Sequence, residues 1–126
     1  MQLVTDVYEI TKALPEQERF GLISQMRRAA VSIPSNVAEG AARKTSKEFI
    51  QYLYISQSSL SELDTQVEIA NRLGWLTEED GRGLENTMNR LDKMLSGLIR
   101  HQQSPHALRL TPHEKMNIQP TDKGVQ

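Results

Sequence analysis

Cysteine is absent from this chain of 126 residues, and aromatic residues make up only 5% of it. The lack of cysteine excludes disulfide bonds, thiolate metal sites and a cysteine nucleophile. The scarcity of aromatic residues means that a hydrophobic core must be mainly aliphatic. A strong charge bias is missing too, because 15 Lys and Arg residues stand against 16 Asp and Glu residues. Binding to nucleic acid would therefore depend on a local basic patch.

Long apolar runs are also missing from the sequence. No stretch approaches the roughly 20 apolar residues that are needed to span a bilayer. The opening residues MQLVTD contain neither the basic nor the apolar part of a signal peptide. The length suits one domain. We therefore expect a single-domain cytoplasmic protein that has no contact with membranes.

Apolar residues recur at helical spacing in four segments, and no segment alternates like a strand. Short connections make successive helices antiparallel neighbours. The fold class that we predict is all-α, an antiparallel up-down-up-down four-helix bundle over residues 1–102 with a disordered, flexible C-terminal tail over residues 103–126. A short docking segment around Leu108 and Leu110 is the alternative for part of that tail. The expected helices cover residues 3–14, 18–42, 46–73 and 78–102.

Local signals mark several helix ends and one irregularity. Thr45 and Glu48 form a capping box before the third segment, and Thr77 is a capping residue for the fourth. Gly74 stands where a left-handed helix cap is wanted. Pro34 lies inside the second segment and predicts a kink there, because proline lacks the N–H donor and clashes with the preceding turn.

Catalytic and metal-binding patterns are missing. His101, His106 and His113 all lie at or beyond the end of the last segment, and no Glu-x-x-His pair faces the bundle. Glu62 and Asp64 flank the apolar stripe of the third segment, where solvated or ion-paired carboxylates are expected. No nucleophile elbow or phosphate-binding loop is present. We therefore predict no enzymatic activity, no cofactor, no metal and no small-molecule substrate.

Five basic residues are the candidates for nucleic-acid contacts. Arg27 and Arg28 lie in the middle of the second segment, and Arg43, Lys44 and Lys47 cluster at the turn before the third. Such a turn can clamp phosphates. The alternative is that the turn residues only complement a helix dipole, since no aromatic residue is interleaved with them. For Arg27 and Arg28, the alternative is that they form ion pairs with carboxylates of the third segment such as Glu62 or Asp64.

Two stretches carry a resemblance to a known family. They are QMRRAAVSIPSNVAEG over residues 25–40 and FIQYLYISQSSLSELDTQVEIANRLGWL over residues 49–76. The chain resembles the bacterial four-helix bundle family of the 23S ribosomal RNA intervening-sequence protein, also labelled S23 ribosomal protein, over about residues 5–101. The resemblance implies an antiparallel bundle that often assembles as a ring of five. More distant relatives are the accessory proteins of diversity-generating retroelements, which bind nucleic acid and a reverse transcriptase.

The chain departs from this family in two respects. Relatives usually carry an additional stretch before the position of Val7 and Tyr8, so either the first helix is short here or the start codon is misassigned. The retroelement accessory proteins are also markedly basic, whereas the net charge here is −1. This near-neutral charge argues against strong binding of nucleic acid.

The predicted function combines the fold, the basic turn and the resemblance. We predict a non-enzymatic homo-oligomeric binding module or scaffold, a pentamer by resemblance, that engages RNA or a nucleoprotein partner through the basic turn. The alternative is a protein–protein adaptor with no role in nucleic-acid binding. Salt dependence distinguishes the two, because phosphate contacts weaken steeply as salt is raised.

Overall fold

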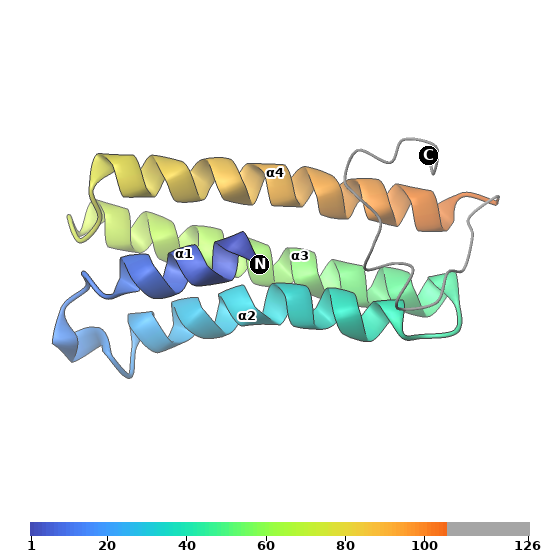
Figure 1. Ribbon diagram of the computed structural model, residues 1–126, viewed down its shortest axis with the longest axis horizontal. Helices are drawn as coiled ribbons and strands as arrows, with labels where there is room; N and C mark the ends of the chain where they lie inside the picture. The colour runs from blue at the N-terminus through green and yellow to red at the C-terminus, as the bar shows by residue number, and fades with distance from the viewer. Residues whose placement is uncertain (106–126) are drawn as a thin grey trace.

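The computed structural model describes residues 1–105, which form four α-helices and one short 3₁₀ helix. The helices run antiparallel in sequence order, so the predicted all-α four-helix bundle is confirmed, and residues 1–105 contain no strand (Figure 1). The predicted tail beyond residue 105, with its alternative docking segment, lies outside the described residues. The elements are α1 (Gln2–Thr11), η1 (Glu16–Glu18), α2 (Leu22–Ala41), α3 (Ser46–Arg72) and α4 (Glu78–Gln103).

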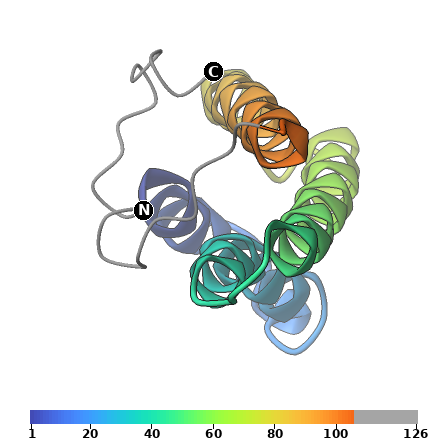
Figure 2. The same ribbon diagram turned by 90° about the vertical axis from the view of Figure 1, so that its right-hand side faces the viewer.

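The core is aliphatic, as the scarcity of aromatic residues requires. Each helix contributes side chains that are at most 1% exposed, among them Val7, Met26, Leu63 and Leu84. Seen from one end, the helices surround this shared interior (Figure 2). The burial of apolar area is the main favourable contribution to folding.

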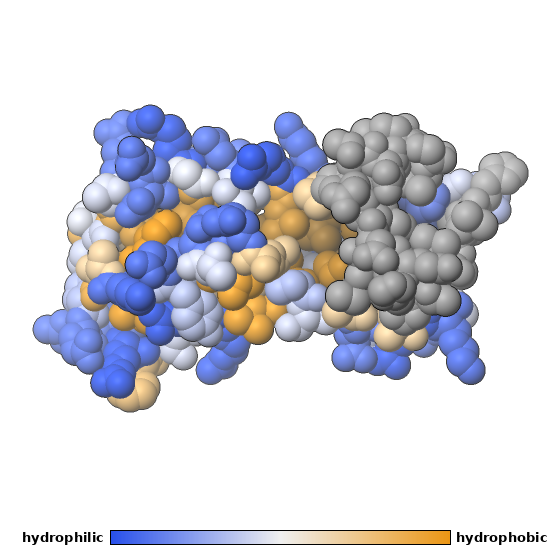
Figure 3. All heavy atoms as spheres, in the orientation of Figure 1, coloured by the Kyte–Doolittle hydropathy of each residue, from blue (hydrophilic) through white to orange (hydrophobic). Residues whose placement is uncertain are grey.

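Helix α1 is much shorter than the other three. It has 10 residues, against 20 in α2 and 27 in α3. It therefore lies along only the half of the bundle that is nearer to η1 (Figure 1). Apolar residues are visible along the middle of the same face, with hydrophilic residues on both sides (Figure 3).

The first expected helix end was placed too late. Helix α1 ends at Thr11, whereas the sequence predicted an end at Leu14. The backbone N–H groups of Ala13 and Leu14 donate three residues back, to Ile10 and Thr11, at 3.1 Å each. This tighter pattern is common in the last turn of a helix.

The start of the second helix was also predicted wrongly. The expected helix from residue 18 is replaced by η1 and a link, and α2 begins at Leu22. Gly21 breaks the helix, with φ −111° and ψ −111°. The side-chain Oε1 of Glu18 accepts a hydrogen bond from the backbone N–H of Leu22 at 3.2 Å. Arg19 and Phe20 consequently lie on a link between helices and not within a helix.

Small residues bring α2 and α3 close together. The hydroxyls of Ser32 and Ser59 lie 2.8 Å apart, and Ser56 donates to the carbonyl of Ile33 at 2.9 Å. A Cβ atom on Gly40 would lie 2.6 Å from the Cβ of Tyr52. The serines and the glycine therefore allow α2 and α3 to pack closely.

Helix ends and the internal proline follow the local signals in most respects. Thr45 Oγ1 accepts from the N–H of Glu48 at 3.1 Å, and Thr77 Oγ1 accepts from the N–H of Asp80 at 3.0 Å. Gly74 has φ +77°, so its predicted left-handed conformation is confirmed. Pro34 lies inside α2 without ending it, and the kink stays a prediction.

Candidate functional site

The five basic candidates lie at two places along the bundle. Arg27 and Arg28 lie in the first half of α2 and line a hollow with Tyr8 and Phe20, whereas Arg43, Lys44 and Lys47 surround the turn between α2 and α3. Fifteen positions separate Arg28 from Arg43, which corresponds to about 22 Å at the rise of an α-helix. The structure therefore does not bring the five residues together in one patch.

Arg43 is held in place at the turn between α2 and α3. One guanidinium nitrogen lies 3.2 Å from Glu39 and donates to the hydroxyl of Tyr52 at 2.6 Å. The guanidinium also lies 5.0 Å from the centre of the Tyr52 ring. Arg43 thus joins the end of α2 to α3, while Lys44 and Lys47 are exposed beside it.

Arg27 joins α2 to α1. Its Nε donates to Thr11 Oγ1 at 3.0 Å, and a terminal nitrogen donates to the Tyr8 carbonyl at 3.2 Å. The guanidinium lies 4.6 Å from the centre of the Tyr8 ring. The expected ion pair of Arg27 with Glu62 or Asp64 is therefore wrong, because α1 and not α3 packs against this side of α2.

Arg28 is exposed, and within residues 1–105 it makes no hydrogen bond or ion pair. It shares the rim of a shallow hollow between α2 and α3 with Glu62, but no ion pair joins the two side chains. The expected pairing of Arg28 with Glu62 or Asp64 is therefore wrong as well. An exposed guanidinium without a partner is free to bind an external anion.

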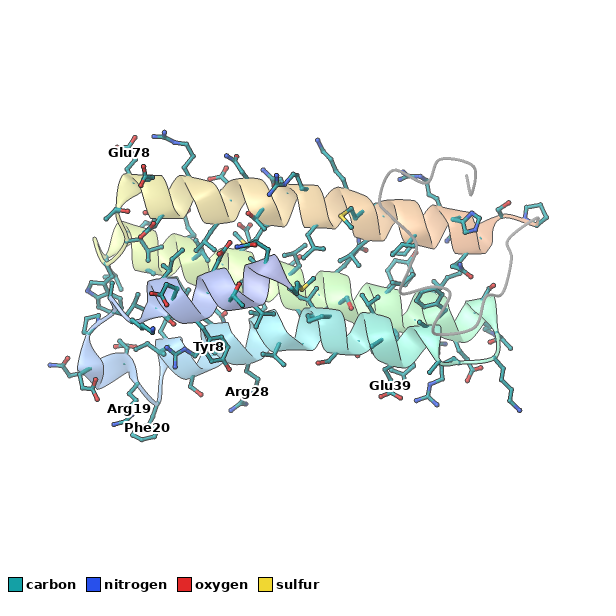
Figure 4. The ribbon with its side chains drawn as sticks, in the orientation of Figure 1. Tyr8, Arg19, Phe20, Arg28, Glu39 and Glu78 are labelled. Carbon is teal, nitrogen blue, oxygen red and sulfur yellow. The ribbon has the colours of Figure 1, made fainter. Side chains whose placement is uncertain are left out.

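A second hollow, of about 410 Å³, collects the two arginines of α2 with residues that the sequence did not single out. Phe20 is 91% exposed, although most large apolar side chains of residues 1–105 are buried or half-buried. Arg19, Phe20 and Arg28 project on the same side of the molecule, next to Tyr8 (Figure 4). The residues that line the hollow are Tyr8, Arg19, Phe20, Ile23, Ser24, Arg27 and Arg28.

The lining of this hollow, which we call the arginine–aromatic site, carries charge of one sign. All three charged residues in it are arginines. A guanidinium nitrogen of Arg19 lies 3.3 Å from a carboxylate oxygen of Glu16, but both side chains are largely exposed. Such exposed ion pairs contribute little to the free energy of folding. The Arg19 guanidinium also lies 5.7 Å from the centre of the Phe20 ring. Planar guanidinium groups beside aromatic rings suit a ligand that has both phosphate oxygens and a flat ring.

Metal-binding clusters and membrane-spanning helices are absent from the part of the chain that the structure describes. It contains no cluster of three or more His, Cys, Asp or Glu side chains that could hold a metal ion. None of its helices is both long enough and apolar enough to cross a membrane. The absence of enzymatic activity stays a prediction.

The sequence that forms this site matches a known protein family. The family model described as 23S rRNA-intervening sequence protein matches residues 1–97. The chain belongs to this family. The match includes every residue of the arginine–aromatic site and of the basic turn, and it confirms the resemblance seen in the sequence. A search of curated proteins found no match. In this member of the 23S rRNA-intervening sequence proteins, the arginine–aromatic site is the feature with the clearest binding chemistry.

Proposed function

We propose that this protein is a non-enzymatic RNA-binding module that contacts RNA phosphates through the arginine–aromatic site. The observation that carries the proposal is the gathering of Arg19, Arg27 and Arg28 around one hollow whose lining contains no carboxylate. Membership of a family whose name refers to a 23S rRNA intervening sequence agrees with an RNA-related role. A net charge of −1 does not oppose it, because a local patch can supply the attraction.

The three arginines have different parts in this proposal. Arg27 is fixed by two hydrogen bonds to α1, so its charge has a defined position. Arg28 has no ion pair within residues 1–105, and it can approach a phosphate without breaking one. Arg19 must exchange its exposed contact with Glu16 for the ligand.

The basic turn remains a second proposed contact. Lys44 and Lys47 are exposed there, and Arg43 beside them binds Glu39 and Tyr52. Because the turn lies about 22 Å along the bundle from Arg28, a short RNA at the arginine–aromatic site would not reach it. We therefore propose that Lys44 and Lys47 add phosphate contacts only for longer RNAs.

Arg28→Ala tests the proposal most directly. We expect weaker binding of single-stranded RNA and a slope of log affinity against log salt that is smaller by about 0.7, the value for one lost phosphate contact. The measurement is fluorescence anisotropy of a labelled oligonucleotide at several salt concentrations. Arg82→Ala is the matched control, since it removes an exposed arginine of α4 that is paired with Glu78. Glu78 lies on the opposite edge of the bundle from Arg28 (Figure 4).

Two results would contradict this proposal. One is the absence of any salt-sensitive RNA binding by the folded wild-type protein. The other is equal loss of binding in Arg28→Ala and Arg82→Ala, which would show a general charge effect without a site. A parallel variant with Arg43, Lys44 and Lys47 all changed to Ala should lose affinity only for long RNAs. If it loses affinity for short ones as well, the turn and not the arginine–aromatic site is the main contact.

We also propose that copies of the chain associate. Tyr54, Ile55 and Ile69 on α3 are 43–50% exposed, although large apolar side chains gain by burial. Light scattering of the wild-type protein should give a mass that is a multiple of the chain mass, and Ile55→Glu should lower it. A monomeric wild-type mass at working concentration would exclude the association. If association is retained and RNA binding is absent, the protein–protein adaptor becomes the better function.

A further inference from the structure

Phe20 is an exposed aromatic side chain that the fold does not use. It is 91% exposed, on the three-residue link between η1 and α2. Core formation therefore gives no reason for a large apolar group at this position. Phe20 nevertheless shares the lining of the arginine–aromatic site with Arg19 and Arg28. An apolar ring held in water beside cations is suited to contact with a ligand.

We propose that Phe20 is a stacking platform for one unpaired base of an RNA, while Arg28 and Arg19 bind the adjacent phosphates. This inference rests on the proposed RNA-binding function and names the part of the RNA that the site takes. Stacking on an aromatic ring tolerates every base, because each base has a π-face. We therefore expect the site to recognise unpaired RNA with little preference for sequence.

The charges around Phe20 favour a nucleotide over a hydrophobic protein surface. An apolar partner that covered Phe20 would also bury the guanidinium groups of Arg19 and Arg28. Burial of unpaired charges costs free energy. A nucleotide presents a flat ring to Phe20 and anionic oxygens to the arginines, so both requirements are met by one ligand.

Double-stranded RNA does not fit the same description. In an A-form duplex the bases are stacked on each other, and the major groove is too deep and narrow for side chains to read. A duplex can offer phosphates to Arg28 but no free base face to Phe20. The contribution of Phe20 should therefore appear only with unpaired bases, such as those of a loop, a bulge or a single strand.

The test compares Phe20→Ala with wild type on two probes, an unstructured RNA 12-mer and the same 12-mer annealed to its complement. Stacking predicts that Phe20→Ala binds the single strand about tenfold more weakly, with the same salt slope and the same duplex affinity. Phe20→Trp should bind the single strand at least as well as wild type. Met94→Ala is the matched control, because it removes a 42% exposed apolar side chain of α4 that belongs neither to the arginine–aromatic site nor to the proposed association surface. Circular dichroism checks that each variant is folded.

The possible outcomes separate this inference from the proposed function. If Phe20→Ala binds the single strand as tightly as wild type while Arg28→Ala does not, the stacking role is wrong and phosphate binding stands. If Phe20→Ala weakens single-strand and duplex binding equally, Phe20 does not recognise an unpaired base. If wild type binds neither probe, both proposals fail. A lower oligomer mass for Phe20→Ala with unchanged RNA binding would assign Phe20 to a contact between copies and overturn the inference.

Discussion

Leu63→Ala is expected to lower the free energy of unfolding by about 2–5 kcal/mol. Leu63 is completely buried in the centre of α3, at 0% exposure. Alanine removes apolar contacts and leaves a cavity that the surrounding helices fill only in part. Helix propensity offsets little of this loss, because leucine and alanine are both good helix formers. Urea denaturation followed by circular dichroism should show a lower midpoint with an unchanged slope.

The matched control for Leu63→Ala is Ile69→Ala on the same helix. Ile69 is 43% exposed, and substitutions at such surface positions usually change stability by less than about 0.5 kcal/mol. The control should be measured below the concentration at which copies associate. If both variants lose the same free energy of unfolding, the face of α3 that carries Leu63 is not more buried than the face that carries Ile69.

Gly40→Ala is expected to destabilise the protein by about 1–3 kcal/mol. A Cβ atom there would lie 2.6 Å from Tyr52 Cβ and 2.9 Å from Phe49 Cδ1. Both neighbours belong to α3, so the added methyl group must push the two helices apart. Alanine is the better helix former by about 1 kcal/mol, but that gain is smaller than the cost of the clash. Urea denaturation measures the net effect.

Gly83→Ala is the control for Gly40→Ala, and its effect should have the opposite sign. Apart from its chain neighbours and the backbone of its own helix, no atom lies within 4 Å of a Cβ atom built on Gly83, which is exposed in α4. The substitution should therefore stabilise the protein by about 0.5–1 kcal/mol through helix propensity alone. Stabilisation by both substitutions would mean that α2 and α3 do not approach closely at Gly40.

The long helices could be predicted because their apolar spacing directly encodes the buried face. The seven residues of α3 that recur at alternating spacings of four and three are all buried: Phe49, Leu53, Ser56, Leu60, Leu63, Val67 and Ala70. Ser56 can be buried among these apolar residues because its side chain is small and its hydroxyl donates a hydrogen bond to the carbonyl of Ile33. In α2 the apolar residues at helical spacing are not all buried. Leu22 and Val37 are half-buried at its two ends, whereas Met26 between them is fully buried.

The arginine–aromatic site could be predicted only in part. Arg27 and Arg28 were candidates from their position in the sequence, but Arg19 and Phe20 were assigned to a helix that does not extend so far. Gly21 was the available signal, since glycine is a weak helix former and is accepted at the first capping position of a helix, where it stands before α2. Periodicity does not show which helix lies beside Arg27, because that depends on how α1 packs. The contact with Tyr8 is therefore a tertiary feature without a sequence pattern.

The shortness of α1 links local stability to ligand affinity. A helix of 10 residues buries fewer side chains against the bundle than each longer helix does, so we expect it to detach more readily than they do. Detachment removes Tyr8 from the arginine–aromatic site and releases Arg27 from Thr11. Only molecules with α1 docked present the complete site. The apparent ligand affinity is therefore the affinity of the complete site multiplied by the fraction of such molecules. By thermodynamic reciprocity, a ligand bound there holds α1 in place and makes this helix part of the cooperative unit.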